Sequence, residues 1–220
     1  MPSLPPLPPA NFNGTIPING IDLWYATFGA PLSSTQAKNQ PPLLFLHGGF
    51  ANSEYWAHQI LHLQDSGHTL ITIDSRAQGR SSDDTTKPIT YDAMTLDVND
   101  APTWKTYMAW VQEDFGRLSP STGTFDEMSG RLLEMWNSEP AWNGTAFGKI
   151  PSVFEEPNAP LVWIVDGDSE EAVNRDVPRT MLDWIWGSSL VILPGVSHFA
   201  FLQDPRTFNA MLDRFLSIER

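Results

Sequence analysis

Short apolar runs alternate with amphipathic stretches at both ends of the chain, whereas the middle carries amphipathic stretches alone. Residues 43–46 form an all-apolar run, which is typical of a strand buried on both faces, and residues 70–73 form a second. Between them, residues 53–64 place apolar side chains at helical spacing, and Asn52 or Ser53 can cap that helix. The order strand, helix, strand predicts a βαβ unit with parallel strands and a right-handed crossover.

The chain before this unit predicts a lead-in followed by a hairpin. Residues 1–14 are rich in proline, which favours an extended lead-in. Residues 15–18 and 21–28 flank Asn19-Gly20, a strong signal for a two-residue hairpin turn. We therefore expect an antiparallel hairpin at the edge of the sheet.

The middle of the chain predicts helices without strands. Apolar periodicity indicates helices over residues 103–115 and 125–136 and a shorter helix within residues 140–147, while residues 91–98 have the pattern of a helix start. Aromatic stripes on such helices usually pack in a core, although they can also line a pocket for a small apolar molecule.

The last third returns to the α/β pattern. Strands are predicted over residues 161–165 and 190–193, the second again buried, and helices over residues 178–186 and 205–218. The chain therefore predicts an α/β fold. Its expected divisions are a lead-in, the first part of a core, a helical cap and the second part of the core: residues 1–14, 15–98, 99–150 and 151–220.

Composition narrows the classes of partner. A formal charge of -13 over 220 residues argues against nucleic acid and anionic membranes, which require clustered Lys and Arg. The chain has no cysteine, which excludes disulfides, thiolate nucleophiles and Cys-based metal sites but leaves the compartment open. The N-terminus has no pattern of a secretory signal, and we expect a cytoplasmic protein. His58 and His62 lie four residues apart without an evident third ligand, so we expect no metal and no cofactor.

Three loops that each follow a predicted parallel strand carry polar residues suited to catalysis. They contain His47-Gly48-Gly49, Gly167-Asp168-Ser169-Glu170 and His198. In an open parallel sheet, the carboxyl ends of the strands form the edge at which ligands bind. Glycines at such a turn let the backbone approach a substrate closely, and a histidine can accept a proton there.

The order and spacing of these motifs resemble the α/β-hydrolase family of esterases, lactonases, epoxide hydrolases and dehalogenases. The resemblance implies that His47-Gly48-Gly49-Phe50 is the oxyanion loop, with the Gly49 N–H as a donor and Phe50 beside it. It further implies that Asp74-Ser75-Arg76-Ala77-Gln78-Gly79-Arg80-Ser81 is the family's supporting turn, with Ala77 in place of the first glycine.

The same resemblance assigns the remaining parts of a catalytic triad. Glu170 falls on the position of the triad acid, with Asp168 as the alternative, and His198 falls on the position of the general base. The family's nucleophile stands on a Gly-x-Ser-x-Gly elbow, and this sequence contains no such motif, so its nucleophile is unknown. Ser129 precedes a glycine, but Glu127 stands where the first glycine is needed.

These observations predict a mostly parallel α/β-hydrolase-like sheet with an N-terminal hairpin and a helical cap, shortened by about two βα units near residues 98–101. The strands at residues 43–46 and 161–165 must then pair directly or expose their edges. The expected function is hydrolysis of an ester, lactone or related bond in a small apolar molecule. Two alternatives stay open, a non-catalytic protein that binds such a molecule and an incomplete version of a full hydrolase. The oligomeric state is left open.

Overall fold

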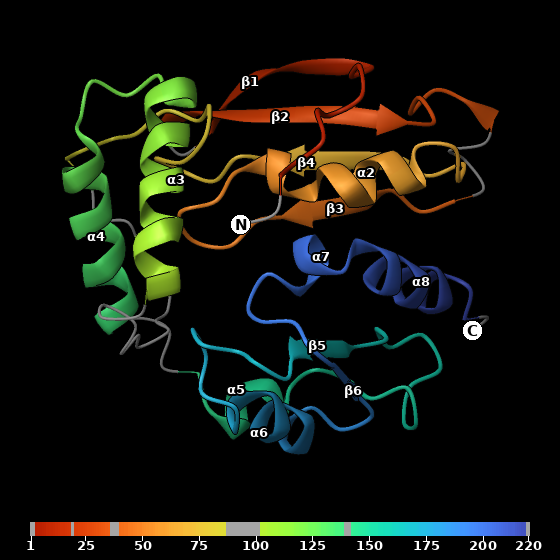
Figure 1. Cartoon of the computed structure of the whole chain (residues 1–220). Coiled ribbons are helices and arrows are strands. Elements are labelled where there is room, and N and C mark those ends of the chain that lie inside the picture. The colour runs from red at the N-terminus through yellow and green to blue at the C-terminus, as the bar shows by residue number, and fades with distance from the viewer. Residues whose placement is uncertain (1–2, 19, 36–39, 87–101, 139–141, 219–220) are drawn as a thin grey trace. The chain divides into compact units, whose positions relative to one another are not determined.

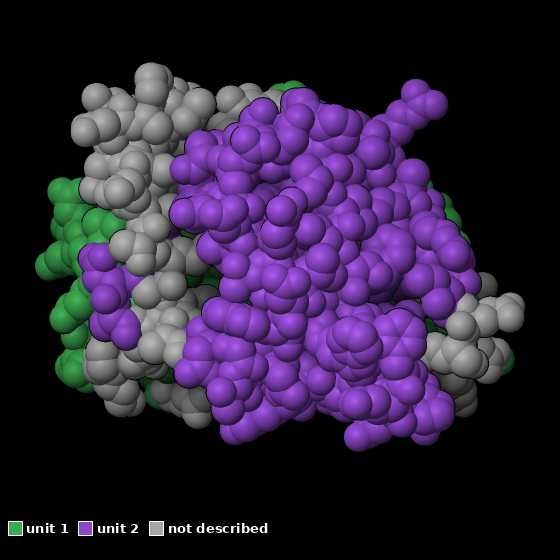
Figure 2. Space-filling model, turned by 90° about the horizontal axis from the view of Figure 1, so that it is seen from below, with its two compact units in different colours: residues 1–90, 101–135 green, residues 91–100, 136–220 purple. Residues whose placement is uncertain are grey.

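The computed structural model describes residues 3–18, 20–35, 40–86, 102–138 and 142–218, without the side chains of residues 102–108 and 110. By their contacts the residues fall into two compact units, residues 1–90 with 101–135 and residues 91–100 with 136–220 (Figure 2). Each unit is described by itself below. The helix start predicted at residues 91–98 and the shortening near residues 98–101 lie outside the described residues.

The first unit contains a four-stranded sheet with strand order β1-β2-β4-β3 (Figure 1). Its strands are β1 (Phe12–Ile18), β2 (Ile21–Gly29), β3 (Leu43–Leu46) and β4 (Thr69–Ile73). β1 and β2 pair antiparallel with Ile18 opposite Ile21, which confirms the predicted two-residue hairpin at the sheet edge. β3 and β4 pair parallel, which confirms the βαβ unit.

The prediction that β3 is buried on both faces was wrong. Phe45 is buried and its ring lies 5.6 Å from that of Trp56, whereas Leu44 and Leu46 on the opposite face are 54% and 59% exposed. The reason is that β3 is the last strand of its sheet and the crossover helix covers the face that carries Phe45. An all-apolar run indicates a strand, but its sequence alone does not determine how many faces are covered.

The crossover of the βαβ unit begins with the 3-10 helix η1 (Ser53–Trp56) and continues as α2 (Ala57–Leu63). Asn52 is the cap, because its side chain accepts a hydrogen bond from the Glu54 N–H at 2.9 Å. Tyr55 and Ile60 are fully buried against the sheet. Each fully buried side chain of this size contributes about 1.5–3 kcal/mol to folding, so this helix anchors the residues that precede it.

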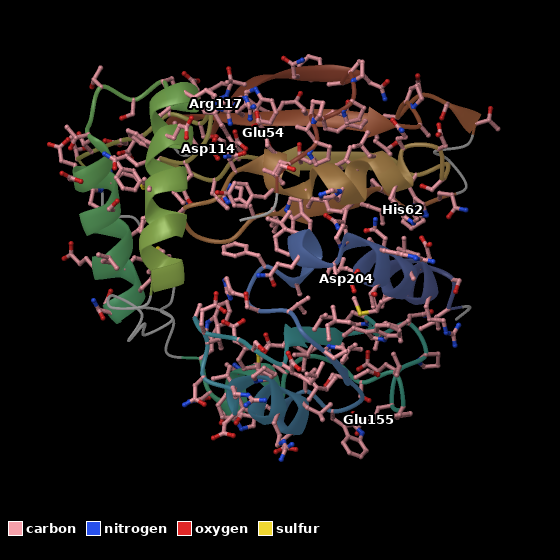
Figure 3. The ribbon with its side chains drawn as sticks, viewed as in Figure 1. Glu54, His62, Asp114, Arg117, Glu155 and Asp204 are labelled. Carbon is pink, nitrogen blue, oxygen red and sulfur yellow. The ribbon has the colours of Figure 1, made fainter. Side chains whose placement is uncertain are left out.

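Two longer helices follow in the first unit, α3 (Pro102–Leu118) and α4 (Phe125–Ser138). Arg117 of α3 donates to Glu54 Oε2 at 2.7 Å and contacts Asp114, and the three side chains lie together in Figure 3. Asp114 in turn accepts a hydrogen bond from Asn52 at 3.1 Å. This polar network attaches α3 to the start of the crossover helix.

The second unit contains a two-stranded parallel sheet of β5 (Trp163–Gly167) and β6 (Ser189–Leu193). Its helices are α5 (Gly144–Phe147), α6 (Val177–Trp184), α7 (Ala200–Gln203) and α8 (Pro205–Leu216). The described residues between α3 and β5 hold helices and no strand, as the apolar periodicity predicted, and the assignment of residues 99–150 as a cap stays a prediction. Leu193, Val196 and Ala200 form a small core against which Phe208 of α8 packs.

Three further details of the strands bear on the sequence prediction. β6 is only partly buried, with Ile192 46% exposed, because β5 is its single strand neighbour among the described residues. β3 and β5 belong to separate sheets, so direct pairing of residues 43–46 with residues 161–165, one of the two predicted alternatives, is not described. The four-stranded sheet is mixed, because β2 runs antiparallel to both of its neighbours, whereas β3 pairs parallel with β4 and β5 with β6.

Candidate active site

Glu170 and His198 lie beyond the carboxyl ends of two neighbouring parallel strands, β5 and β6. His198 Nδ1 is 3.0 Å from Oε2 and 3.1 Å from Oε1 of Glu170. The Glu170 side chain is 2% exposed and that of His198 is 31% exposed, so the carboxylate is enclosed while the imidazole reaches solvent. Because Nδ1 faces the carboxylate, it carries the proton, and Nε2 is the nitrogen that can accept one.

Hydrogen bonds between the two loops hold this pair in place. Asp168 Oδ1 accepts from the Gly195 N–H at 2.8 Å, and the Ser169 N–H donates to the Val196 carbonyl at 3.0 Å. A side chain at Gly167 would place its Cβ 2.4 Å from the Val196 carbonyl oxygen, so only glycine permits this close approach. Asp168, the alternative acid, thus braces the turn, while Glu170 is the acid whose carboxylate contacts His198.

The surroundings of Glu170 and His198 shift the pKa values of both side chains in the direction that favours an ion pair. Burial acts to raise the pKa of Glu170, but the hydrogen bond and charge of His198 and the N–H groups of Ala172 and Val173 outweigh it and lower that pKa to about 2. Burial acts to lower the pKa of His198, but Glu170 outweighs it and raises that pKa above its ordinary value. The carboxylate is therefore ionised throughout the neutral range.

Two further acids, Asp166 in β5 and Glu171 in the loop after it, were not singled out from the sequence. The His198 N–H donates to Glu171 Oε2 at 3.3 Å. Burial, together with a hydrogen bond to Glu170 and the charge of Glu170, raises the pKa of Asp166 to about 6. Asp166 is the penultimate residue of β5, and the sequence showed it only as one of several acids in a polar run.

The predicted oxyanion loop joins β3 to η1 in the first unit. Phe50 has a positive φ of 62° and is 2% exposed, a backbone conformation that costs a non-glycine residue about 1–2 kcal/mol. His47 Nε2 accepts a hydrogen bond from the Ser75 N–H at 2.9 Å, so its Nδ1 carries the proton and donates to the Gly48 carbonyl at 2.7 Å. Burial lowers the pKa of His47, which keeps the imidazole neutral as both bonds require.

The turn after β4 supports this loop through Asp74, which is fully buried. Its Oδ1 accepts from the Ser53 N–H at 2.8 Å and its Oδ2 from the Arg80 N–H at 2.8 Å. Ala77 adopts a φ of 65°, a left-handed conformation that favours glycine, the residue that the resemblance predicts at this position. Gly79, with a φ of 55°, leaves the space that the Asp74 carboxylate occupies.

The structure also shows which residues it does not join into a site. Ser129 lies within α4 with no strand before it, so it does not form a strand-to-helix elbow. Gly49 and Phe50 belong to the first unit and Glu170 and His198 to the second, and the roles assigned to them stay predictions. Among the described residues, no three His, Asp or Glu side chains form a group that could hold a metal ion.

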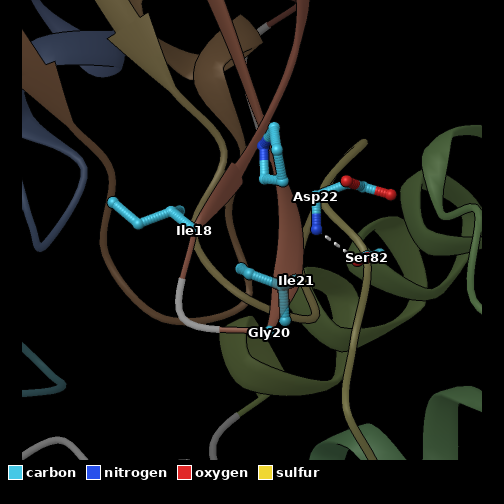
Figure 4. Close-up of a pocket in the computed structure, with 6 residues that line it drawn as sticks. Ile18, Gly20, Ile21, Asp22 and Ser82 are labelled. Carbon is cyan, nitrogen blue, oxygen red and sulfur yellow. Dashed lines mark hydrogen bonds between the residues drawn. The ribbon is translucent and has the colours of Figure 1, made fainter.

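Cavities within each unit bear on where a ligand could bind. Under α3 and α4 the first unit encloses about 10 Å³ beside Phe50, Asn52 and Phe115, which has room for a single water. A larger space of about 340 Å³ lies at the hairpin tip, lined by Ile18, Ile21, Asp22 and Ser82 (Figure 4). In the second unit, a space of about 400 Å³ is lined in part by Asp166 and Asp168.

No helix in the described part of the chain has both the length and the apolar character needed to cross a bilayer.

The chain was compared with known proteins. A family model described as alpha/beta hydrolase fold matches residues 41–117, which span the βαβ unit, the Asp74 turn and most of α3. A search of curated proteins finds no match.

Several solved structures are similar over most of the chain. An enol-lactonase from Burkholderia xenovorans has a TM-score of 0.68 at 12% identity, over 91% of this chain and 98% of that one. A meta-cleavage product hydrolase from Pseudomonas fluorescens has a TM-score of 0.66 at 12% identity, over 94% and 97%. A carboxylesterase from Bacillus subtilis has a TM-score of 0.56 at 14% identity, over 94% and 91%. These similarities show that the chain has an α/β-hydrolase fold, truncated relative to full hydrolases.

Proposed function

We propose that the protein hydrolyses an ester, lactone or related bond in a small apolar molecule. The observation that carries this proposal is the enclosed Glu170 carboxylate bonded to Nδ1 of His198 at the ends of two parallel strands. This geometry fixes the tautomer of His198 and stabilises the imidazolium that forms when Nε2 takes up a proton. Similarity to a lactonase and a carboxylesterase supports the same class of bond.

In the proposed reaction, Nε2 of His198 removes a proton from water as the oxygen attacks the carbonyl carbon. The resemblance of His47-Gly48-Gly49-Phe50 to an oxyanion loop assigns to the Gly49 N–H the role of stabilising the negative charge that develops on the carbonyl oxygen. The proton on Nε2 then passes to the departing alkoxide, which leaves a carboxylic acid and an alcohol. Without the Gly-x-Ser-x-Gly elbow, water takes the place of the serine nucleophile.

This chemistry predicts modest activity. When triad members are removed from serine hydrolases, oxyanion stabilisation and binding leave an acceleration of about 10³ to 10⁴ over water. The rate should rise with pH, because the raised pKa of His198 keeps part of the imidazole protonated near neutrality. A chromogenic-ester assay of the wild type and His198→Ala tests the proposal. We expect a rate above background that His198→Ala abolishes, and equal background rates would exclude catalysis.

A non-catalytic binding protein is the second candidate. It is favoured by the absence of an elbow motif from the sequence and by the position of Ser129 within a helix. Saturable binding of an apolar ester that survives His198→Ala, together with background hydrolysis, would establish this alternative. A third candidate, an incomplete version of a hydrolase, predicts broad thermal unfolding with exposed apolar surface, and a sharp cooperative transition would argue against it.

A further inference from the structure

The loop that carries His198 is fastened by side chains that come from both sides of it in the sequence. From the loop after β5, Glu171 Oε2 accepts a hydrogen bond from the His198 N–H at 3.3 Å. From α7, Gln203 makes two hydrogen bonds to Ser197, the residue directly before His198. Neither the sequence motifs nor the reaction proposed above gives Gln203 a part.

The Gln203 amide binds the backbone and the side chain of Ser197 at once. Its Oε1 accepts a hydrogen bond from the Ser197 N–H at 2.6 Å, and its Nε2 donates to Ser197 Oγ at 2.7 Å. A backbone N–H can only donate, so the amide oxygen must face it, and the amide nitrogen then faces the hydroxyl oxygen. Because two hydrogen bonds fix both the position and the orientation of the amide, Gln203 restrains Ser197 more tightly than a single contact would.

Gln203 itself is held in place through its backbone. It is the last residue of α7, a short helix in which Ala200 is 6% and Leu202 is 1% exposed. The next residue, Asp204 (Figure 3), caps α8 by accepting a hydrogen bond from the Thr207 N–H at 3.1 Å. The amide therefore extends from a fixed point, and it can hold the loop that it contacts.

The partner of His198 is held separately. Glu170 Oε1 accepts hydrogen bonds from the N–H groups of Ala172 at 2.5 Å and Val173 at 2.9 Å, which belong to the loop of Glu170 itself. The carboxylate would therefore not follow His198 if the loop after β6 moved. Nδ1 of His198 lies 3.0 Å from Oε2 of Glu170, so an increase of about 0.5 Å would take this pair out of hydrogen-bond range.

We propose that Gln203 is a positioning residue for His198: by holding the residue before it, the Gln203 amide keeps Nδ1 against the Glu170 carboxylate. The proposal rests on the proposed function for its catalytic meaning alone. Its physical content is the contact between His198 and Glu170, which can be measured without a substrate.

The pKa of His198 reports on this contact. Burial acts to lower that pKa, but the hydrogen bond and charge of Glu170 outweigh it, and the charges of Glu171 and Asp166 act in the same direction as Glu170. If the imidazole moves away from Glu170, the largest of the raising effects weakens and the pKa of His198 falls. The ring of Phe199 also contacts the imidazole, with the ring centroids 5.0 Å apart, so Phe199 is kept in every variant.

The test is an NMR titration of the His198 ring in the full chain, for the wild type and for Gln203→Met, Gln203→Glu and Gln112→Met. Gln203→Met keeps the length of the side chain and removes both hydrogen bonds, so the His198 midpoint should move to lower pH and the Ser197 amide should exchange hydrogen about 2- to 10-fold faster. Gln203→Glu should keep the midpoint at or above the wild-type value, because a carboxylate can accept from both the N–H and the hydroxyl of Ser197. Gln112 is an exposed glutamine of α3, so Gln112→Met should change neither property.

Three outcomes would overturn the proposal. They are an unchanged His198 midpoint in folded Gln203→Met, an equal fall in Gln112→Met, and a fall in Gln203→Glu as large as that in Gln203→Met. Thermal unfolding of each variant checks that the fold is retained. If Gln203→Met does not fold, Ser197→Ala removes the hydrogen bond to the hydroxyl alone; it should lower the midpoint to a smaller extent, and an unchanged midpoint there would also overturn the proposal. Because the titration needs no turnover, the proposed hydrolysis can fail while this proposal holds, and the reverse is equally possible.

Discussion

The substitution Glu170→Gln tests whether the enclosed ion pair stabilises the second unit. Its carboxylate is 2% exposed, bonds His198 and accepts a hydrogen bond from the Val173 N–H at 2.9 Å. A pKa lowered from 4.5 to about 2 corresponds to about 3 kcal/mol of stability at neutral pH. The charge of Asp166 opposes this stabilisation, because Glu170→Gln also removes the repulsion between the carboxylates of Asp166 and Glu170. We therefore expect Glu170→Gln to lower the free energy of unfolding by about 1–2 kcal/mol at pH 7.

The sign of the pH dependence follows from the direction of this shift. The pKa of Glu170 is lower in the folded protein than the ordinary value of 4.5, so its contribution is complete above pH 4.5 and is lost as the pH falls towards 2. At pH 3 about two fifths of the contribution should remain. The difference between wild type and Glu170→Gln should shrink accordingly.

Urea unfolding of both proteins at pH 7 and pH 3 measures this difference. Glu155→Gln is the matched control, since Glu155 is an exposed glutamate of the same unit (Figure 3) and should change stability by no more than about 0.5 kcal/mol. A loss of stability that is equal at both pH values would show that Glu170 acts through packing rather than charge. No loss at pH 7 would refute the inferred ion pair.

Two further predictions concern the first unit. Gly79→Ala should lower the free energy of unfolding, measured in urea, by about 2–4 kcal/mol, because the φ of Gly79 is 55° and the new Cβ would lie 2.2 Å from Asp74 Oδ2. The control Gly48→Ala places its Cβ where no atom lies within 4 Å, so it should cost far less. Equal losses of stability in the two variants would contradict this prediction. Hydrogen exchange of the Ser75 amide, corrected for intrinsic exchange, should become faster as the pH falls below 6.5. The reason is that the pKa of His47 is lowered in the folded protein, so the unfolded chain binds a proton at His47 more readily. His47→Gln should remove this pH dependence, and its persistence in that variant would refute the role of His47.

The fold and the candidate site could be predicted from the sequence wherever a single motif specified the local conformation or the role of a residue. Asn19-Gly20 specified the hairpin because its turn needs a positive φ, and Gly20 has one of 79°. The resemblance to the α/β-hydrolases assigned the triad acid to Glu170, with Asp168 as the alternative, and Glu170 is the acid that contacts His198. The sequence could not distinguish Asp166 from the other acids of its polar run. Its raised pKa is caused by burial and by Glu170, and both effects arise only when the chain folds.

The sequence by itself determined the order of strands and helices, the hairpin and the two loops that carry His47 and His198. These follow from local causes, namely apolar periodicity, glycine conformation and capping. Tertiary structure alone decided that Leu44 and Leu46 face outward, that Asp168 braces a turn while Glu170 faces the imidazole, and that burial and Glu170 raise the pKa of Asp166. These properties depend on which groups from distant parts of the chain meet and on how much water they exclude, and neither is encoded in any single segment.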